Sequence, residues 1–381
     1  MYFDETYYIK GAKTYLSFIP DTNWTHPPLG KIMISAGIFF FGDNTLGWRI
    51  TGILLGSLMI ILMYFLAQRL FKSRFAGISA AILTAICPLN IVQSRIATLD
   101  IFLTFFTLLG FYFLYLYIDT ETGKTKKEKT MLVLCVISFG LSCACKWSGI
   151  FAIAGALIIL FYYKFFSREK RTRAPGSFIS ILALFFIITS AVYLASYIPF
   201  FLQKQSFNQF ILNHVKSVTF HYESSFAHNY LTPVWTWPLM IRPMWFYFQQ
   251  IPHDKYQGII SMGNPFIWWS FLIFFIFIII DFIKTRKDTL FFIIAGYLSL
   301  YLPWFISTKG GFFYYLEPAT IFMYLGITCI LTRWWETKNK NLVILYFIAA
   351  FVFFITFLPV IIAVPVNKAF FYKLMWFKSW I

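Results

Sequence analysis

Long apolar stretches separated by short polar ones form the dominant pattern of this chain. A membrane-spanning helix needs about 20 mostly apolar residues, and ten such stretches occur, at 46–68, 75–93, 97–118, 130–146, 148–164, 177–200, 264–283, 289–306, 312–332 and 342–362. The pattern predicts an all-α fold, a polytopic transmembrane helical bundle with about ten spans. The tight turn at 146–149 is its least defined boundary.

Basic residues predict which side of the membrane each connection faces. Short cytoplasmic loops collect Lys and Arg, and alternate connections hold eighteen of the 32 basic residues, at 69–74, 119–129, 164–174, 284–288 and 333–341. We expect these loops in the cytoplasm. The other connections are then extracytoplasmic, and they carry most of the polar motifs.

This alternation predicts five consecutive segments. They are an outer-face segment with an interfacial helix, an N-terminal transmembrane bundle, a long outer loop, a four-span region and an outer tail, at 1–45, 46–200, 201–263, 264–362 and 363–381. Met1 falls outside with no preceding span to carry it across the membrane. We therefore expect either an additional first helix upstream or translocation of this segment by the first hairpin.

Composition agrees with a membrane protein and changes how the charge is interpreted. The chain is 59% hydrophobic, against about 45 to 50% in soluble domains, and its mean hydropathy is +0.70. The net charge of +17 comes from residues between apolar stretches. No basic stripe with interleaved aromatics occurs, which argues against nucleic-acid binding. The five cysteines lie in apolar stretches and indicate neither disulfides nor a zinc site.

Adjacent carboxylates stand near the start of the chain, in an aromatic segment at the expected outer membrane edge. Asp4 or Glu5, shielded by the neighbouring rings, could keep a raised proton affinity and act as a general base. A solvated charged pair at a chain terminus is the alternative interpretation.

The segment 26–31 is a second outer-face motif that places charge at the membrane boundary. Pro27 and Pro28 would stiffen the backbone and hold His26 and Lys31 against the surface; an ordinary turn with a snorkelling lysine is the alternative.

The segment 93–100 places Arg95 and Asp100 at the boundary, where charges are costly and usually functional. Arginine presents a planar fork that suits phosphate. A structural ion pair between these two residues would explain them equally.

The long outer loop and the turn after 306 contribute weaker candidates. Trp237 and Arg242 lie in a tryptophan-rich run that could stack on sugars, although an interfacial aromatic belt is the commoner explanation. Lys309 could contact a phosphate or could be the polar tip of a tight turn. The histidines show no metal-ligand spacing, so no metal site is predicted and a divalent cation stays unsupported.

Taken in order, these motifs resemble the bacterial protein O-mannosyltransferases, multi-spanning enzymes of the GT-C type that use a polyprenyl-phosphate or dolichyl-phosphate mannose donor. The similarity runs from the second residue to beyond residue 318. It is carried by Phe3-Asp4-Glu5, His26 to Lys31, Phe41 to Asn44, Gly47-Trp48-Arg49, Ser94 to Asp100, Lys146 to Gly149, Trp237-Pro238, Arg242-Pro243, Gly263-Asn264-Pro265, Trp268-Trp269 and Tyr301 to Trp304.

The resemblance implies a reaction and roles for individual residues. Asp4 would be the catalytic base for an acceptor Ser or Thr hydroxyl, with inversion at the sugar, and Glu5 would shape the site beside it. Arg95, with Lys309, would bind the donor phosphate, although an arginine is expected at position 309. The family's eleven-span pattern has a helix before the Asp-Glu motif, and its eukaryotic members carry a soluble insert in the long loop; this sequence shows neither.

Partners and location follow from the same resemblance. We expect a lipid-phosphate sugar donor, an exported protein acceptor, surrounding membrane lipid, and a multi-pass protein of the plasma membrane with an extracytoplasmic active site. A transferase that decorates a lipid or a cell-envelope glycan is the alternative. A transporter fits less well, because charges near the bilayer midplane are almost absent and no internal repeat is visible.

Overall fold

Helices dominate the computed structural model of the chain, which describes residues 1–120, 125–168, 177–223, 228–307 and 310–381. The chain packs into two units. Unit 1 comprises 1–58, 94–166 and 170–228, and unit 2 comprises 59–93, 167–169 and 229–381. These units are defined by packing, whereas the five segments expected from the sequence are defined by membrane sidedness. That segment division therefore stays a prediction.

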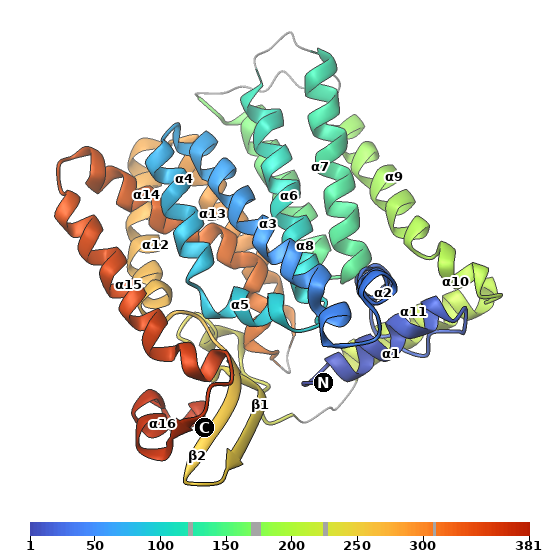
Figure 1. Ribbon diagram of the computed structural model, residues 1–381. Coiled ribbons are helices and arrows are strands. Elements are labelled where there is room, and N and C mark those ends of the chain that lie inside the picture. The colour runs from blue at the N-terminus through green and yellow to red at the C-terminus, as the bar shows by residue number, and fades with distance from the viewer. Residues whose placement is uncertain (121–124, 169–176, 224–227, 308–309) are drawn as a thin grey trace. The chain divides into compact units, whose positions relative to one another are not determined.

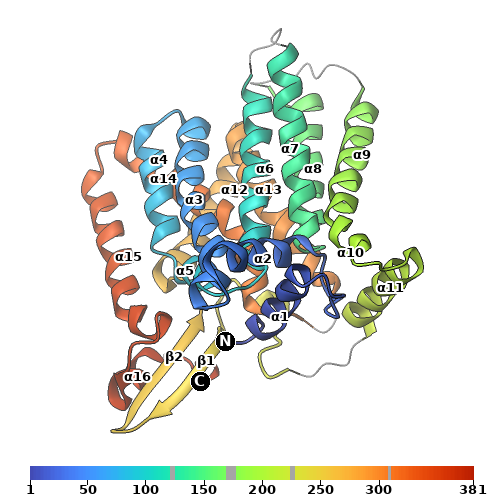
Figure 2. The ribbon, with the colours of Figure 1, turned by 45° about the vertical axis from the view of Figure 1, so that its right-hand side comes forward.

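Unit 1 is built from helices. They are α1 (Glu5–Leu16), α2 (Leu29–Phe41), the start of α3 (Thr45–Phe71), α6 (Asp100–Asp119), α7 (Thr125–Cys145), α8 (Gly149–Phe165), α9 (Phe178–Ser196), α10 (Ile198–Leu202) and α11 (Phe207–Glu223). Figures 1 and 2 show α6, α7, α8 and α9 standing side by side, with α1, α2, α10 and α11 gathered at one end of them.

Small residues bring the helices of unit 1 close together, as is common in membrane bundles. A Cβ on Gly110 of α6 would lie 2.5 Å from the Phe139 ring of α7, so any larger residue would force this ring to move. A buried hydrogen bond joins the Thr107 and Ser142 hydroxyls at 2.9 Å across the same pair of helices. These contacts fix α6 against α7 and thereby the side chains at their ends.

The helices of unit 2 pack around one central helix of the same unit. Its elements are the rest of α3, α4 (Arg74–Ala85), α5 (Pro88–Arg95, whose last two residues belong to unit 1), η1 (Val234–Thr236), β1 (Met244–Ile251), β2 (Lys255–Ser261), α12 (Pro265–Thr285), α13 (Asp288–Tyr301), η2 (Leu302–Ile306), η3 (Phe313–Ala319), α14 (Thr320–Glu336), α15 (Lys340–Ile361), β3 (Val366–Asn367), α16 (Lys368–Leu374) and η4 (Lys378–Trp380). Every residue of α14 from Thr320 to Thr332 is buried. Helices α4, α12, α13 and α15 pack around it.

A small antiparallel sheet of order β1-β2-β3 departs from the all-α expectation. Strands β1 and β2 form a hairpin in which Ile251 pairs with Lys255, and the turn has positive φ at His253 and Asp254. The aromatic run of β1 suits a half-buried strand. The sequence pattern places this run in the long outer loop 201–263 and predicts no strand there.

The membrane spans follow the predicted stretches with two differences. Among the described residues, eight helices are long and apolar enough to cross a membrane. The stretch 75–93 is bent by 61° between α4 and α5, because Pro88 cannot continue the hydrogen bonding of the preceding helix. The stretch 148–164 forms α8, which has only 17 residues. The exact number of spans stays a prediction.

Candidate active site

Glu5 is fully buried at the start of α1, where four hydrogen bonds hold its carboxylate. The Arg49 guanidinium donates from Nε to Oε1 at 2.7 Å and from Nη2 to Oε2 at 2.8 Å. The backbone N–H groups of Ala97 and Tyr2 donate at 2.9 and 2.8 Å. Burial alone would raise the pKa of Glu5, but Arg49 and the two N–H groups outweigh it and lower that pKa. Glu5 is therefore an anion that ties α1 to the segment around residue 97.

Asp4, one residue earlier, has a contrasting environment. Burial raises its pKa to about 6, and the nearby carboxylate of Asp100 adds to this rise. The ammonium of Lys146 and a hydrogen bond from Tyr8 act in the opposite direction. A carboxylate with this proton affinity can accept a proton near neutral pH.

The Lys146–Asp100 ion pair lies at the ends of two helices. Asp100 begins α6, and Lys146 follows the last residue of α7. Since α6 and α7 are antiparallel neighbours, these residues meet, and Lys146 Nζ lies 2.8 Å from Asp100 Oδ1 with both side chains buried. Asp100 thus pairs with Lys146, whereas the alternative interpretation from the sequence was an ion pair with Arg95.

Arg95 lies in the last turn of α5 and is half-buried. It is within electrostatic reach of Arg49, Tyr2 and Glu5. Two guanidinium groups therefore share the surroundings of one buried carboxylate. The planar guanidinium of Arg95 is of a kind that binds an anion such as a phosphate.

Three of the five histidines join one aromatic cluster in unit 1. The His26 and His221 rings stack at 5.4 Å between centroids, and Trp147 lies 6.1 Å from His221 and 6.0 Å from His214. Burial and the positive charge of Lys146 lower the pKa of His26, which keeps the ring neutral. Burial also lowers the pKa of His221.

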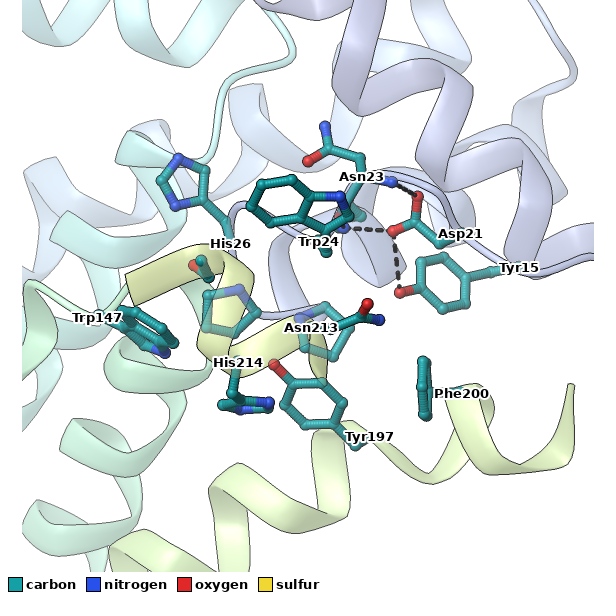
Figure 3. A pocket seen from close by; sticks show the side chains of 14 residues that line it. Tyr15, Asp21, Asn23, Trp24, His26, Trp147, Tyr197, Phe200, Asn213 and His214 are labelled. Atoms are coloured by element: carbon teal, nitrogen blue, oxygen red, sulfur yellow. Dashed lines mark hydrogen bonds and ion pairs between the residues drawn. The ribbon is translucent and has the colours of Figure 1, made fainter. Parts of the chain in front are cut away.

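A small pocket opens beside His26. Figure 3 shows Tyr15, Asp21 and Trp24 facing Asn213, Tyr197 and Phe200 across it. Its wall includes the buried Lys31, which is paired with Asp21 and donates to the Asn23 carbonyl. Lys31 therefore contributes to the wall as half of an ion pair, whereas the sequence had offered a snorkelling side chain as the alternative.

The predicted site residues are divided between the two units. Asp4, Glu5, His26, Lys31, Arg95 and Asp100 all belong to unit 1. Trp237 belongs to unit 2, where its indole is 1% exposed and donates to Thr232 Oγ1 at 3.1 Å. Arg242, also in unit 2, lies over the Tyr230 ring at 5.2 Å. Lys309 lies outside the described residues.

Sequence reasoning assigned no role to several residues of this neighbourhood. Arg49, Lys146 and His221 contact the predicted site residues or act on them, and Trp147 lines the pocket beside His26. These residues come from distant parts of the chain. Arg49 and Lys146 had appeared only as members of motifs. The one sequence signal that could have identified such residues was a polar side chain at the end of an apolar stretch. Within the described residues, no group of three His, Cys, Asp or Glu side chains is placed to hold a metal ion.

The fold is that of the GT-C membrane glycosyltransferases. It matches the Saccharomyces cerevisiae protein O-mannosyltransferase Pmt1-Pmt2 complex bound to the sugar donor, with a TM-score of 0.85 and 14% identity over 99% of this chain and 89% of that chain. ArnT from Cupriavidus metallidurans bound to undecaprenyl phosphate matches with a TM-score of 0.64 and 15% identity, over 90% of this chain and 58% of that one.

Sequence comparison identifies the family. The model described as dolichyl-phosphate-mannose-protein mannosyltransferase matches residues 1–207, and that of the C-terminal four-transmembrane region of protein-O-mannosyltransferase matches residues 206–380. The chain belongs to this family of membrane glycosyltransferases.

Curated relatives carry matching names. The polyprenol-phosphate-mannose–protein mannosyltransferase of Mycolicibacterium smegmatis is 23% identical over 93% of this chain and 81% of that protein. Its Mycobacterium tuberculosis counterpart is 24% identical over 93% of this chain and 80% of its own length.

Proposed function

We propose that this chain transfers mannose from a polyprenyl-phosphate carrier to Ser and Thr hydroxyls of exported proteins, with inversion at the anomeric carbon. The observation that carries the proposal is the contrast at the start of α1. Glu5 is locked as an anion by Arg49, while Asp4 keeps a pKa of about 6. Family membership supports the choice of donor and sugar.

In the proposed reaction Asp4 takes the proton of the acceptor hydroxyl while the hydroxyl oxygen attacks the anomeric carbon. The bond from that carbon to the phosphate oxygen breaks, and polyprenyl phosphate leaves as an anion. One carboxylate suffices because the leaving group needs no proton, in contrast to glycoside hydrolysis. Glu5 anchors this segment, and His26, Lys31 and Asp100 shape the surroundings.

Arg95 is assigned to the donor phosphate, with Lys309 as a second contact. The position of Arg95 near Arg49 and Glu5 supports this assignment, because a planar guanidinium can stabilise the negative charge of the departing phosphate. Trp237 and Arg242 are retained as proposed site-shaping residues of the long loop.

An extracytoplasmic site on the plasma membrane is part of the proposal. Asp100 and Lys146 lie at one end of α6 and α7, and the basic connections 119–129 and 164–174 join the opposite ends of α6, α7, α8 and α9. If the basic connections are cytoplasmic, the site faces outward, where exported proteins arrive.

A transfer assay tests the proposed function and its alternative. Membranes that contain the full chain receive polyprenyl phosphate carrying labelled mannose, and label is followed into protein and lipid fractions. Label in protein that is released by β-elimination, which cleaves sugars from Ser and Thr, is the expected result. Label confined to lipid or envelope glycan would establish the alternative acceptor class. Absence of transfer from this donor to any acceptor would overturn the proposal.

Arg95 gives a separate prediction about donor binding. Arg95→Lys keeps the charge but loses the planar fork, so partial affinity for polyprenyl-phosphate mannose should remain, whereas Arg95→Ala should lose most of it. Lys13→Ala, which removes a charge from a surface ion pair in the same unit, is the control and should bind normally. Normal donor binding by Arg95→Ala would remove Arg95 from the site.

A further inference from the structure

The buried Lys146–Asp100 pair takes no direct part in the reaction described so far, yet it is costly to maintain. Its side chains are only 7% and 4% exposed. Removing two charges from water is unfavourable, and their mutual attraction compensates for this only with good geometry. An apolar pair would fill the same space without that cost, so the position of the charges needs an explanation.

The pair lies within electrostatic reach of Asp4. The Ala97 N–H donates to Glu5 Oε1 at 2.9 Å, so the backbone around Asp4 and Glu5 adjoins the segment that leads directly into Asp100. The groups that act on the Asp4 carboxylate are Tyr8 from α1, Asp100 from α6 and Lys146 after α7. The adjacent Glu5 charge is balanced by Arg49. Lys146 is thus the cation of this set.

We propose that Lys146, fixed by Asp100, is a positioning residue of the transfer reaction whose ammonium keeps Asp4 in the anionic form that accepts the acceptor's proton. This inference rests on the proposed role of Asp4. Burial favours the neutral carboxylic acid, which cannot accept that proton. The Lys146 charge offsets burial enough for the anion to form.

Asp100 has a definite purpose in this arrangement. A lysine bonded to Asp4 alone would stabilise its carboxylate strongly and leave a weak base. Because the ammonium is 2.8 Å from Asp100, the Asp100 carboxylate balances part of its charge. The ammonium therefore lowers the pKa of Asp4 less than a lysine without this partner would. Asp4 therefore stays ionised at neutral pH while keeping a substantial proton affinity. The same ammonium disfavours protonation of His26 and His221.

The pH profile of kcat/KM tests the inference, with polyprenyl-phosphate mannose and a Ser/Thr-containing acceptor peptide as substrates. The donor phosphodiester stays ionised over the whole pH range. The fall of kcat/KM at low pH, the acid limb of the profile, therefore reports the protonation of a group on the protein. Lys146→Met leaves Asp100 as an unbalanced like charge and should move the acid limb upward by about one to three pH units. Lys146→Arg should restore a limb near that of the wild type. The double variant Lys146→Met with Asp100→Asn should lie between the wild type and the single Met variant.

Two comparisons separate this electrostatic role from a structural one. Lys31→Met breaks another buried ion pair of unit 1. This variant can be slower than the wild type, but the acid limb of its pH profile should stay at the wild-type pH. If Lys146→Met does not fold, the double variant, which leaves no unpaired charge, must still show an upward displacement. A Lys146→Met or double variant that is slower at every pH, with an unmoved limb, would overturn the inference.

Failure of the inference and failure of the proposed function give different results. If Asp4→Asn transfers mannose at the normal rate, Asp4 is not the base and both ideas fall. If Asp4→Asn is inactive while the limb of Lys146→Met stays in place, only the role of Lys146 is lost.

Discussion

At the scale of single residues, two adjacent carboxylates have opposite environments. Glu5 receives the Arg49 fork and two backbone N–H groups. Asp4 is half-buried, and its neighbours offset the effect of burial only in part, so that its pKa rises to about 6. One carboxylate is suited to holding structure and the other to exchanging a proton. The difference comes from partners far away in sequence, since Arg49 is 44 residues from Glu5.

The Glu5–Arg49 pair should make a measurable contribution to stability. Breaking a buried ion pair by removing one partner costs about 3 to 5 kcal/mol, so Glu5→Gln and Arg49→Met should each lower the stability of the detergent-solubilised protein strongly. The double variant should lose less than the sum of the two. Thermal unfolding followed by size-exclusion fluorescence measures the three variants, and strictly additive losses would contradict a coupled pair.

At the scale of elements, helix packing brings together the residues of the candidate site. Asp100 and Lys146 are 46 positions apart and meet because α6 and α7 pack closely over Gly110 and Phe139. This packing tolerates little additional volume. The site therefore depends on a contact in the middle of the two helices as well as on its own side chains.

Gly110→Ala should destabilise this helix pair by about 1 to 3 kcal/mol, because the added methyl group overlaps the Phe139 ring. Phe139→Leu in the same chain makes room and should recover part of the loss. Ala154→Val adds apolar volume at an exposed position of α8 and should be nearly neutral. Thermal stability in detergent compares the variants; a neutral Gly110→Ala would show that the contact relaxes easily.

The sequence predicted the helical elements well, because runs of apolar residues record burial in lipid directly. It missed the β1–β2 hairpin, since the aromatic residues at 244–248 suit an interfacial belt as well as a strand. It placed Asp4, Glu5, Arg95 and Asp100 in one predicted site, and these four residues all belong to unit 1, but it could not distinguish their partners. The ion pair between Lys146 and Asp100 depends on how α6 and α7 pack. No local sequence pattern predicts that packing.

At the scale of the whole molecule, the chain is a multi-pass membrane protein of the mannosyltransferase family. The basic-residue pattern predicts the sidedness of its connections, and the proposed site requires that residues 1–45 face outward. Sidedness and chemistry are therefore linked. A donor presented at the outer leaflet could meet an exported protein there.

Cysteine labelling in intact cells tests this orientation. The native cysteines are all buried and free, so they give a low background or can be replaced. A cysteine at Asp43 should react with an impermeant reagent from outside, whereas one at Lys126 should react only after the membrane is opened. External labelling at position 126, or protection at position 43, would reverse the predicted topology.

The most direct test of the central claim is to compare donor binding with turnover in Asp4→Asn. This change preserves size but removes the base, so transfer from polyprenyl-phosphate mannose should fall by about 100-fold to 10,000-fold while donor binding stays near normal. Asp254→Asn, the same change at an exposed turn, should leave both unchanged. In the wild type, transfer should rise with pH through about 6, the pKa of Asp4, because only the ionised carboxylate accepts the proton. Near-normal transfer by Asp4→Asn, with loss in Glu5→Gln, would move the catalytic role to Glu5; normal transfer by both variants would contradict the account.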